Sequence, residues 1–195
     1  MFLEFYYFHL GEIKELEFSL LFYYNYIKEI ESTMFEYKIA TKEDLERIWD
    51  MNIEDNPNDE RWVSWKNKYI SYNLTHKAIT FIVSCNGKPV GEGTLLLSSE
   101  CSAINGRKEL ADGEFVANVN ALRIRKEYEG QGHISKLIKL MEEYASNLGI
   151  KVLTIGVEAK ETRNLAIYLH WDFDEFVFNT VEDGELILYY QKRIK

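Results

Sequence analysis

The sequence predicts a mixed, mostly antiparallel α/β sheet with one central parallel strand pair, helices on its faces and an N-terminal helical extension. The first observation is a strand that ends at Ile124, turns through Gly130 and Gly132, and continues into a helix and a second apolar strand, Lys151–Val157. Two parallel neighbours need such a crossover helix. The second observation is a pair of hairpin signals, Asn86-Gly87 and Glu182-Asp183-Gly184, which add antiparallel strands.

Composition limits the class of protein and its partners. The chain has 195 residues, 46% of them hydrophobic, and can bury one sizeable core, so we expect one domain besides the extension. The formal charge of −9 disfavours nucleic acid and anionic membranes as partners and attracts cationic ligands. No apolar run reaches the roughly 18 residues of a membrane helix. Cys85 and Cys101, with no C-x-x-C pair and four scattered histidines, indicate reduced thiols, a cytoplasmic protein and no metal site.

Residues 1–33 form the predicted extension, and 34–195 the main domain. Apolar residues of the extension recur at steps of three and four, as in an amphipathic helix: Ile13, Leu16, Leu20, Tyr23, Ile27 and Ile30. Such a helix would pack on its own domain or on a twin subunit in a homodimer. A basic start and a small-residue cleavage site, which a signal peptide needs, are missing. The alternative is that Met34 is the true start and the segment is a mis-assigned leader.

Two helices and three strands are expected in the first half of the domain. Phe35–Ile39 alternates as a strand. Thr41 to Asp44 resembles a capping box that opens a helix burying Leu45, Ile48 and Trp49. Asn56 to Asp59 is a turn before a second helix, Glu60 to Leu74. Its aromatic residues belong to the core or border an acceptor pocket: Trp62, Trp65, Tyr69 and Tyr72. The strands around Asn86-Gly87 are Ala78–Ser84 and Pro89–Leu97.

The second half holds the central strand, the crossover helix and the last hairpin. Ser98 to Gly113 is a polar loop, either a substrate gate or a surface excursion. Phe115 to Arg125 is the central strand, and Phe176–Phe178 and Leu186–Tyr190 form the last hairpin. The helix after the glycines repeats apolar residues on one face: Ile134, Leu137, Ile138, Met141, Ala145 and Leu148.

Strand, glycine turn and helix together present unpaired N–H groups to an anion such as a pyrophosphate. The run from Glu127, E-Y-E-G-Q-G-H-I-S-K-L-I, resembles motif A of the Gcn5-related N-acetyltransferases (GNAT), whose Q/R-x-x-G-x-G/A loop holds the pyrophosphate of acetyl-CoA. The run Thr162–Phe173, T-R-N-L-A-I-Y-L-H-W-D-F, resembles the family's second signature. The resemblance covers about Phe35 to Ile194. Three positions depart from the pattern: Glu129, Ile134 and Asp172.

The resemblance implies a fold, a co-substrate and roles for named residues. The central strands splay apart, and acetyl-CoA enters there along the backbones of Leu122 and Ile124. Asn164 would bond the cofactor arm, and Tyr168 would be the general acid towards the sulfur. The remaining cofactor-binding residues implied are those of the loop and the first helical turn: Gly130, Gln131, Gly132, His133 and Ile134.

A base is expected because only about one alkylamine in a thousand is unprotonated at neutral pH. Many family members carry a glutamate near the positions of Asn118 and Asn120. These share one strand face and would orient a substrate or a water. Glu92, Glu114 and Glu158 are the other carboxylates considered. Each has a solvated surface role as its simplest interpretation, and Glu158 is the candidate base. Proton relay through water is the alternative.

The predicted activity is transfer of an acetyl group from acetyl-CoA to a primary amine of a small cationic molecule or a peptide, by direct attack in a ternary complex. The competing hypothesis is a non-catalytic acyl-CoA-binding or regulatory module of the same fold. The sequence does not single out one amine.

Overall fold

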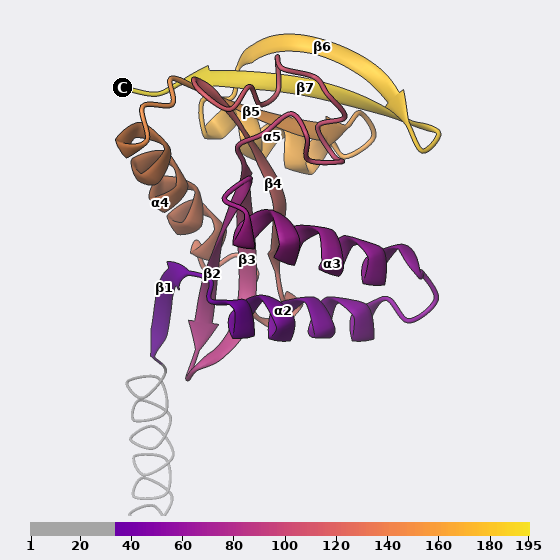
Figure 1. The fold of residues 1–195 in the computed structure, drawn as a ribbon, viewed down its shortest axis with the longest axis vertical. Helices are drawn as coiled ribbons and strands as arrows, with labels where there is room; N and C mark the ends of the chain where they lie inside the picture. Colours follow the sequence, from indigo (N-terminus) through magenta and orange to yellow (C-terminus); the bar gives the residue numbers. More distant parts are fainter. Residues whose placement is uncertain (1–33) are drawn as a thin grey trace, which may run out of the picture. The chain divides into compact units, whose positions relative to one another are not determined.

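A computed structural model describes residues 34–195, and Glu36–Lys195 form one compact unit. The predicted helical extension, with its alternative as a leader and its role in a homodimer, lies outside the described residues. Figure 1 shows the elements. The strands are β1 Phe35–Ile39, β2 Ala78–Cys85, β3 Lys88–Leu96, β4 Val116–Ile124, β5 Val152–Glu158, β6 Glu175–Glu182 and β7 Glu185–Arg193. The helices are α2 Lys42–Asp55, α3 Arg61–Leu74, α4 His133–Asn147 and α5 Thr162–His170, with a short 3-10 turn, η1, at Lys126–Tyr128.

The strands form one sheet in the order β1-β2-β3-β4-β5-β7-β6. β4 and β5 pair in parallel, whereas β2–β3, β3–β4, β5–β7 and β6–β7 pair antiparallel. α4 is the crossover between the parallel strands. The predicted fold class, a mostly antiparallel sheet around one central parallel pair, is therefore confirmed.

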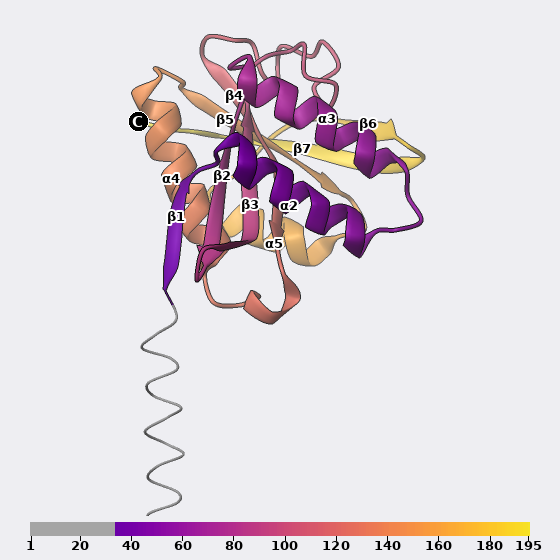
Figure 2. The same cartoon turned by 60° about the horizontal axis from the view of Figure 1, so that its bottom comes forward.

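Helices cover both faces of the sheet, as Figures 1 and 2 show. Successive residues of a strand point to opposite faces. On β2, the Thr80 hydroxyl accepts a hydrogen bond from Asn73 of α3 (3.0 Å), while the neighbouring Phe81 packs edge-on against Tyr144 of α4 (5.5 Å between ring centroids). One face therefore carries α2 and α3, and the other carries α4.

The predicted turn and cap chemistry is present. Thr41 caps α2 and exchanges hydrogen bonds with Asp44 as a capping box. Asn86 and Gly87 have φ of 50° and 76°, as a type I′ hairpin requires. Asp183 and Gly184 do the same at the β6–β7 turn, with φ of 49° and 85°. Short-range signals therefore placed these boundaries well.

Two local expectations are corrected. The segment 98–113 is no surface loop, because its apolar side chains are buried in the main core: Cys101, Ile104, Leu110 and Ala111. Arg107 in this segment also pairs with Glu182 of β6 at 2.5 Å, so opening it as a gate would expose core side chains. Leu148 is 49% exposed rather than part of the buried helix face, because α4 ends at Asn147. No helix within 34–195 is both long and apolar enough to cross a membrane.

Candidate active site

A bulge in the middle of β4 opens the sheet between the parallel strands. Glu92 of β3 pairs with Arg123, but Thr94 pairs with Asn120, so two residues of β4, Ala121 and Leu122, oppose one residue of β3. Ala121, one of the two bulged residues, has a left-handed backbone conformation (φ 51°). The β4–β5 pairing runs only from Val116–Val152 to Val119–Ile155. The two strands therefore separate at the bulge.

The separation leaves backbone groups of β4 available on the β5 side. The Arg125 N–H donates to Val90 O of β3 (2.9 Å), and alternate residues of a strand direct their N–H and C=O groups to opposite edges. Arg123 and Arg125 therefore face β3, whereas Leu122 and Ile124 face the edge where no strand of the described chain continues the pairing. These are the two residues predicted to run along an extended ligand.

The loop after β4 ends in an anion cradle at the start of α4. Gly130 and Gly132 have φ of 73° and 81°, and a Cβ at either position would meet no atom within 4 Å. Gly132 is the N-cap of α4, and no side chain of residues 34–195 caps this helix end. The N–H groups of the first turn thus lack intrahelical acceptors at the positive end of the dipole. This geometry fits a pyrophosphate.

The His133 side chain connects the cradle to β1. Its Nδ1 lies 2.7 Å from the Tyr37 hydroxyl of β1, and its Nε2 lies 3.3 Å from Gln131 Oε1. Burial and the neighbouring Lys136 lower the pKa of His133. A neutral ring, with Nδ1 accepting and Nε2 donating, satisfies both contacts at neutral pH. His133 therefore offers the backbone amide to the cradle and uses its side chain to hold the loop on β1.

One cavity of about 700 Å³ joins these features. It runs from α2 and α3, past the exposed edge of β4, to the cradle and α5. Among the predicted cofactor and catalytic residues, it is lined by Leu122, Ile124, Gly130, Gly132, His133, Ile134, Asn164 and Tyr168. Gln131, Asn118, Asn120 and Glu158 are not part of its lining. Glu129 lines it and is exposed, so its carboxylate has solvent on one side.

Tyr168 and Asn164 reach the cavity from α5. Burial raises the pKa of Tyr168 to about 12, so its hydroxyl stays protonated throughout the neutral range. Its ring stacks on Trp171 at 5.9 Å, and no group within residues 34–195 hydrogen-bonds its hydroxyl. The hydroxyl is therefore available to donate to a ligand. Asn164 donates to Glu161 one turn earlier, which orients its amide.

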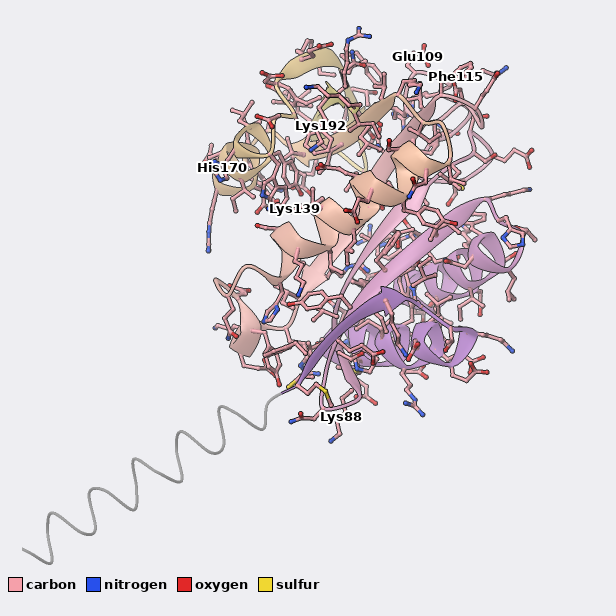
Figure 3. All side chains as sticks on the ribbon, turned by 90° about the vertical axis from the view of Figure 1, so that its left-hand side faces the viewer. Lys88, Glu109, Phe115, Lys139, His170 and Lys192 are labelled. Atoms are coloured by element: carbon pink, nitrogen blue, oxygen red, sulfur yellow. The ribbon has the colours of Figure 1, made fainter. Side chains whose placement is uncertain are left out.

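A buried lysine supports this end of α5. Lys192 of β7 donates to Trp171 O at the helix end (2.9 Å), pairs with Glu142 of α4, and lies 4.7 Å from the Phe173 ring centroid. Figure 3 shows Lys192 between α4 and α5. The contacts tie α5 to α4 and β7, and the stack on Trp171 extends this support to Tyr168.

The opposite wall of the cavity carries a buried ion pair. Glu92 is fully buried, and its Oε1 accepts from Arg123 (2.6 Å) and from Asn52 of α2 (2.8 Å). The expectation of a solvated surface role for Glu92 is therefore wrong, because β3 lies inside the sheet and α2 covers this face. Arg123 lines the cavity beside a pair of neighbouring indoles, 5.0 Å from the Trp49 centroid and 4.8 Å from the Trp62 centroid.

Asn118 and Asn120 do share one strand face, but they belong to a buried hydrogen-bond chain. Tyr69 of α3 donates to Asn120 (2.6 Å), Asn120 to Asn118 (3.2 Å) and Asn118 to Thr154 of β5 (2.9 Å). The chain ends where Thr154 donates to a backbone carbonyl, Leu110 O (2.8 Å). Their amides are used within the protein, so the structure gives no direct support to a substrate-binding role, which stays a prediction.

Glu158 lies away from the cavity. Lys160 pairs with its carboxylate at 3.1 Å and with Glu185 at 2.5 Å. The structure therefore does not bring Glu158 together with Tyr168 and the cradle, and its role as base also stays a prediction.

Sequence reasoning missed the residues on the α2 and α3 side of the cavity, above all Arg123 and Asn52. A usable signal existed for Arg123. It lies between Leu122 and Ile124, so strand alternation points its side chain to the face opposite theirs. Arg163 and His170 of α5, and Trp171 at its C-terminal end, were not singled out either.

Comparison with known proteins agrees with this architecture. The profile of the acetyltransferase (GNAT) family matches residues 27–173. No curated protein sequence matches the chain. An N-acetyltransferase from Staphylococcus aureus Mu50 superposes with a TM-score of 0.63 at 15% identity, covering 83% of this chain and 99% of that one.

Two further solved structures share the fold. A putative acetyltransferase from Salmonella typhimurium, solved with its cofactor acetyl-CoA, has a TM-score of 0.60 at 12% identity, over 83% of this chain and 94% of that one. A ribosomal-protein-alanine N-acetyltransferase from Brucella melitensis has a TM-score of 0.62 at 15% identity, over 82% and 99%. Likeness at such identities concerns the fold alone, whereas the profile covers most of the chain. The chain belongs to the GNAT acetyltransferase family.

Proposed function

We propose that this protein transfers an acetyl group from acetyl-CoA to a primary amine of a small molecule or a peptide, in the cytoplasm, by direct attack within a ternary complex. The observation that carries the proposal is one continuous cavity that joins the exposed backbone edge of Leu122 and Ile124, the uncapped N-terminus of α4 and the Tyr168 hydroxyl. The thioester, the pantetheine arm and the pyrophosphate of acetyl-CoA match the Tyr168 hydroxyl, the free β4 edge and the α4 N-terminus, respectively.

Each group of site residues has a separate role in the proposed reaction. The amides of the first α4 turn, with Gly130 and Gly132, hold the pyrophosphate, and the free edge of β4 pairs with the pantetheine arm. Acetyl-CoA supplies the acetyl group as a thioester, whose C–S bond breaks as the C–N bond forms. Tyr168 donates a hydrogen bond to the departing sulfur, which its raised pKa permits at any physiological pH. A protonated hydroxyl of this kind stabilises negative charge on the sulfur more readily than it gives up its own proton.

Removal of the amine proton is proposed to proceed through water. Asn118 and Asn120 are amides, which cannot accept the proton, and they are already hydrogen-bonded to one another. Glu158 is paired with Lys160 outside the cavity. Glu129 and Asp55 line the cavity and can receive a proton relayed by water to its mouth.

A peptide acceptor is suggested by one protein of the same fold. The Brucella protein of the same fold is described as a ribosomal-protein-alanine N-acetyltransferase. The net charge of −9 favours cationic acceptors in general through long-range attraction. The acceptor wall itself, however, carries the cationic side chain of Arg123.

The test begins with calorimetric titration by acetyl-CoA, with ADP and NAD as controls. We expect micromolar binding of acetyl-CoA alone, followed by thiol release when an amine panel is added. Tyr168→Phe should lower kcat at least tenfold and leave acetyl-CoA affinity nearly unchanged, because a ring without its hydroxyl still stacks on Trp171. Tyr190→Phe, on β7 and outside the cavity, is the matched control. Absence of acetyl-CoA binding would refute the cradle assignment and the transferase with it.

The second candidate function is an acyl-CoA-binding or regulatory module without turnover. The observation that favours it is the amide pair, Asn118 and Asn120, because neither side chain can act as the base that the resemblance implies near these positions. Binding of acetyl-CoA with no thiol release across amines of every class would support this module. A rate that depends on the Tyr168 hydroxyl would exclude it.

A further inference from the structure

Arg123 points into the acceptor part of the cavity, away from the cofactor cradle. Its neighbour Leu122 faces α4, since Leu122 and Met141 would both contact a Cβ added at Gly93. Alternation therefore turns Arg123 to the α2 and α3 face, where it contacts Trp49 and Trp62. The cradle lies at the start of α4, in another part of the same cavity, so a cofactor phosphate and Arg123 do not occupy the same place.

A buried carboxylate holds the Arg123 guanidinium in place on the side away from the cavity. Glu92, which is completely buried, takes one Nη1 hydrogen bond at 2.6 Å, and Asn52 fixes the same carboxylate oxygen at 2.8 Å. Trp49 and Trp62, which are neighbours of each other, both pack against the guanidinium and restrict its movement towards them. A buried carboxylate costs several kcal/mol of desolvation, so such a pair stabilises a fold poorly compared with apolar residues. Its evident effect is to fix one arginine against the cavity wall.

The cavity edge of this arginine keeps unused donors. Of its five N–H donors, only one has an acceptor among the residues that the structure describes, while 29% of the side chain is exposed. Both indoles pack against the guanidinium, and because their centroids lie only 6.1 Å apart they do not enclose it but leave an edge open to the cavity. Two parallel N–H groups on such an edge match the two oxygens of a carboxylate.

We propose that Arg123 binds a carboxylate of the acceptor, so that the preferred amines are amino acids or short peptides with an anionic group close to the reacting nitrogen. This rests on the proposed function and narrows its substrate class. It also replaces the cationic acceptor expected from net charge, because a fixed donor fork inside the cavity acts at hydrogen-bond range. The carboxylates of Asp55 and Glu129, elsewhere on the lining, favour the ammonium end of such a zwitterion.

The experiment compares each common amino acid with its carboxamide as acceptor, by thiol release and by calorimetric binding to the protein saturated with CoA. The amide is the less basic amine, with a pKa near 8, so more of it is unprotonated at neutral pH and basicity alone favours it. We expect kcat/KM and affinity to favour at least some acids over their amides by tenfold or more. Equal or better use of every amide overturns the proposal.

Arg123→Lys keeps a positive charge opposite buried Glu92 but removes the two parallel N–H donors of the guanidinium. We expect the acid-to-amide ratio to fall towards one, with acetyl-CoA affinity unchanged, and Arg47→Lys on the outer face of α2 to leave the ratio as it is. If Arg123→Lys does not fold, the double variant Arg123→Met with Glu92→Gln removes both charges together and answers the same question. A ratio that survives both changes overturns the assignment of Arg123.

Failure of the proposed function gives a different pattern. Acetyl-CoA binding without turnover of any acid or amide removes the transferase, and the calorimetric comparison then decides the role of Arg123 by itself. Turnover of amines with no preference for acids removes only the carboxylate site.

Discussion

Replacement of Gly132 by alanine tests the anion cradle most directly. Gly132 has φ of 81° at the N-cap of α4, and an added Cβ meets nothing within 4 Å. The penalty in the free protein is therefore conformational and not steric. A left-handed alanine costs roughly 1–2 kcal/mol, and we expect the free energy of unfolding to fall by about that amount.

Binding should suffer separately. Gly132 lines the cavity, so the added methyl group lies in the space that a phosphate oxygen needs to reach backbone N–H groups at about 2.9 Å. We expect the Kd for acetyl-CoA to rise at least tenfold, which corresponds to about 1.4 kcal/mol. Urea unfolding measures the first quantity and calorimetric titration the second.

Gly149 provides the matched control. It follows the other end of α4, has φ of 87°, and its added Cβ also meets nothing within 4 Å. Gly149→Ala should lose the same 1–2 kcal/mol of stability and bind acetyl-CoA normally, because it does not line the cavity. Equal Kd values for the two variants would refute the argument that the α4 N-terminus holds the pyrophosphate.

Two further predictions follow from shifted pKa values. Burial lowers the pKa of His133, so the unfolded chain takes up this proton more readily, and stability should fall as the pH drops below about 6.5. Urea unfolding at pH 7.5 and 5.5 should show a smaller difference for His133→Gln than for the native chain. Burial, with a hydrogen bond to Glu182, raises the pKa of Tyr189 from 10.0 to about 12, so on the order of 2–3 kcal/mol of stability should be lost between pH 10 and 12. The loss of stability between pH 10 and 12 should be smaller in Tyr189→Phe. If ultraviolet absorbance shows that the Tyr189 phenol titrates near its ordinary pKa of 10.0, the prediction is contradicted.

Local sequence signals predicted the frame of the cofactor site. The run from Ile124 through Gly130 and Gly132 carries its own turn chemistry, because only glycine takes positive φ at no cost. The Asn86-Gly87 turn and the Thr41 cap are equally local. These features depend on residues within a few positions of each other, and the sequence displays them together.

The acceptor wall depends on long-range register and was not predicted. Glu92 meets Arg123 because the bulge at Ala121 shifts the β3–β4 pairing by one residue. An alanine with φ of 51° has no sequence signature, so neither the bulge nor the ion pair was visible beforehand. The core position of Cys101 and Leu110 was missed for a related reason, since their apolar neighbours are spaced irregularly and their partners come from α3, β3 and β7.

A substitution of Asn118 can separate two roles of this residue. The sequence predicts that it binds substrate, whereas its contacts indicate a structural role. Asn118 is 1% exposed, donates to Thr154 and accepts from Asn120. Asn118→Asp cannot donate to Thr154, whose own hydroxyl hydrogen is directed to Leu110 O, so two acceptors would face each other in a buried site. We expect a loss of about 2–4 kcal/mol in the free energy of unfolding, measured with urea.

The acceptor KM of Asn118→Asp decides between the two roles. If the hydrogen-bond chain from Tyr69 to Leu110 only fixes β4 against α3 and β5, KM changes less than threefold at a temperature where the variant is folded. A large rise in KM with little loss of stability would mean that Asn118 leaves the chain to meet the substrate. The proton route through water would then need revision, because the amide pair would lie at the reacting nitrogen.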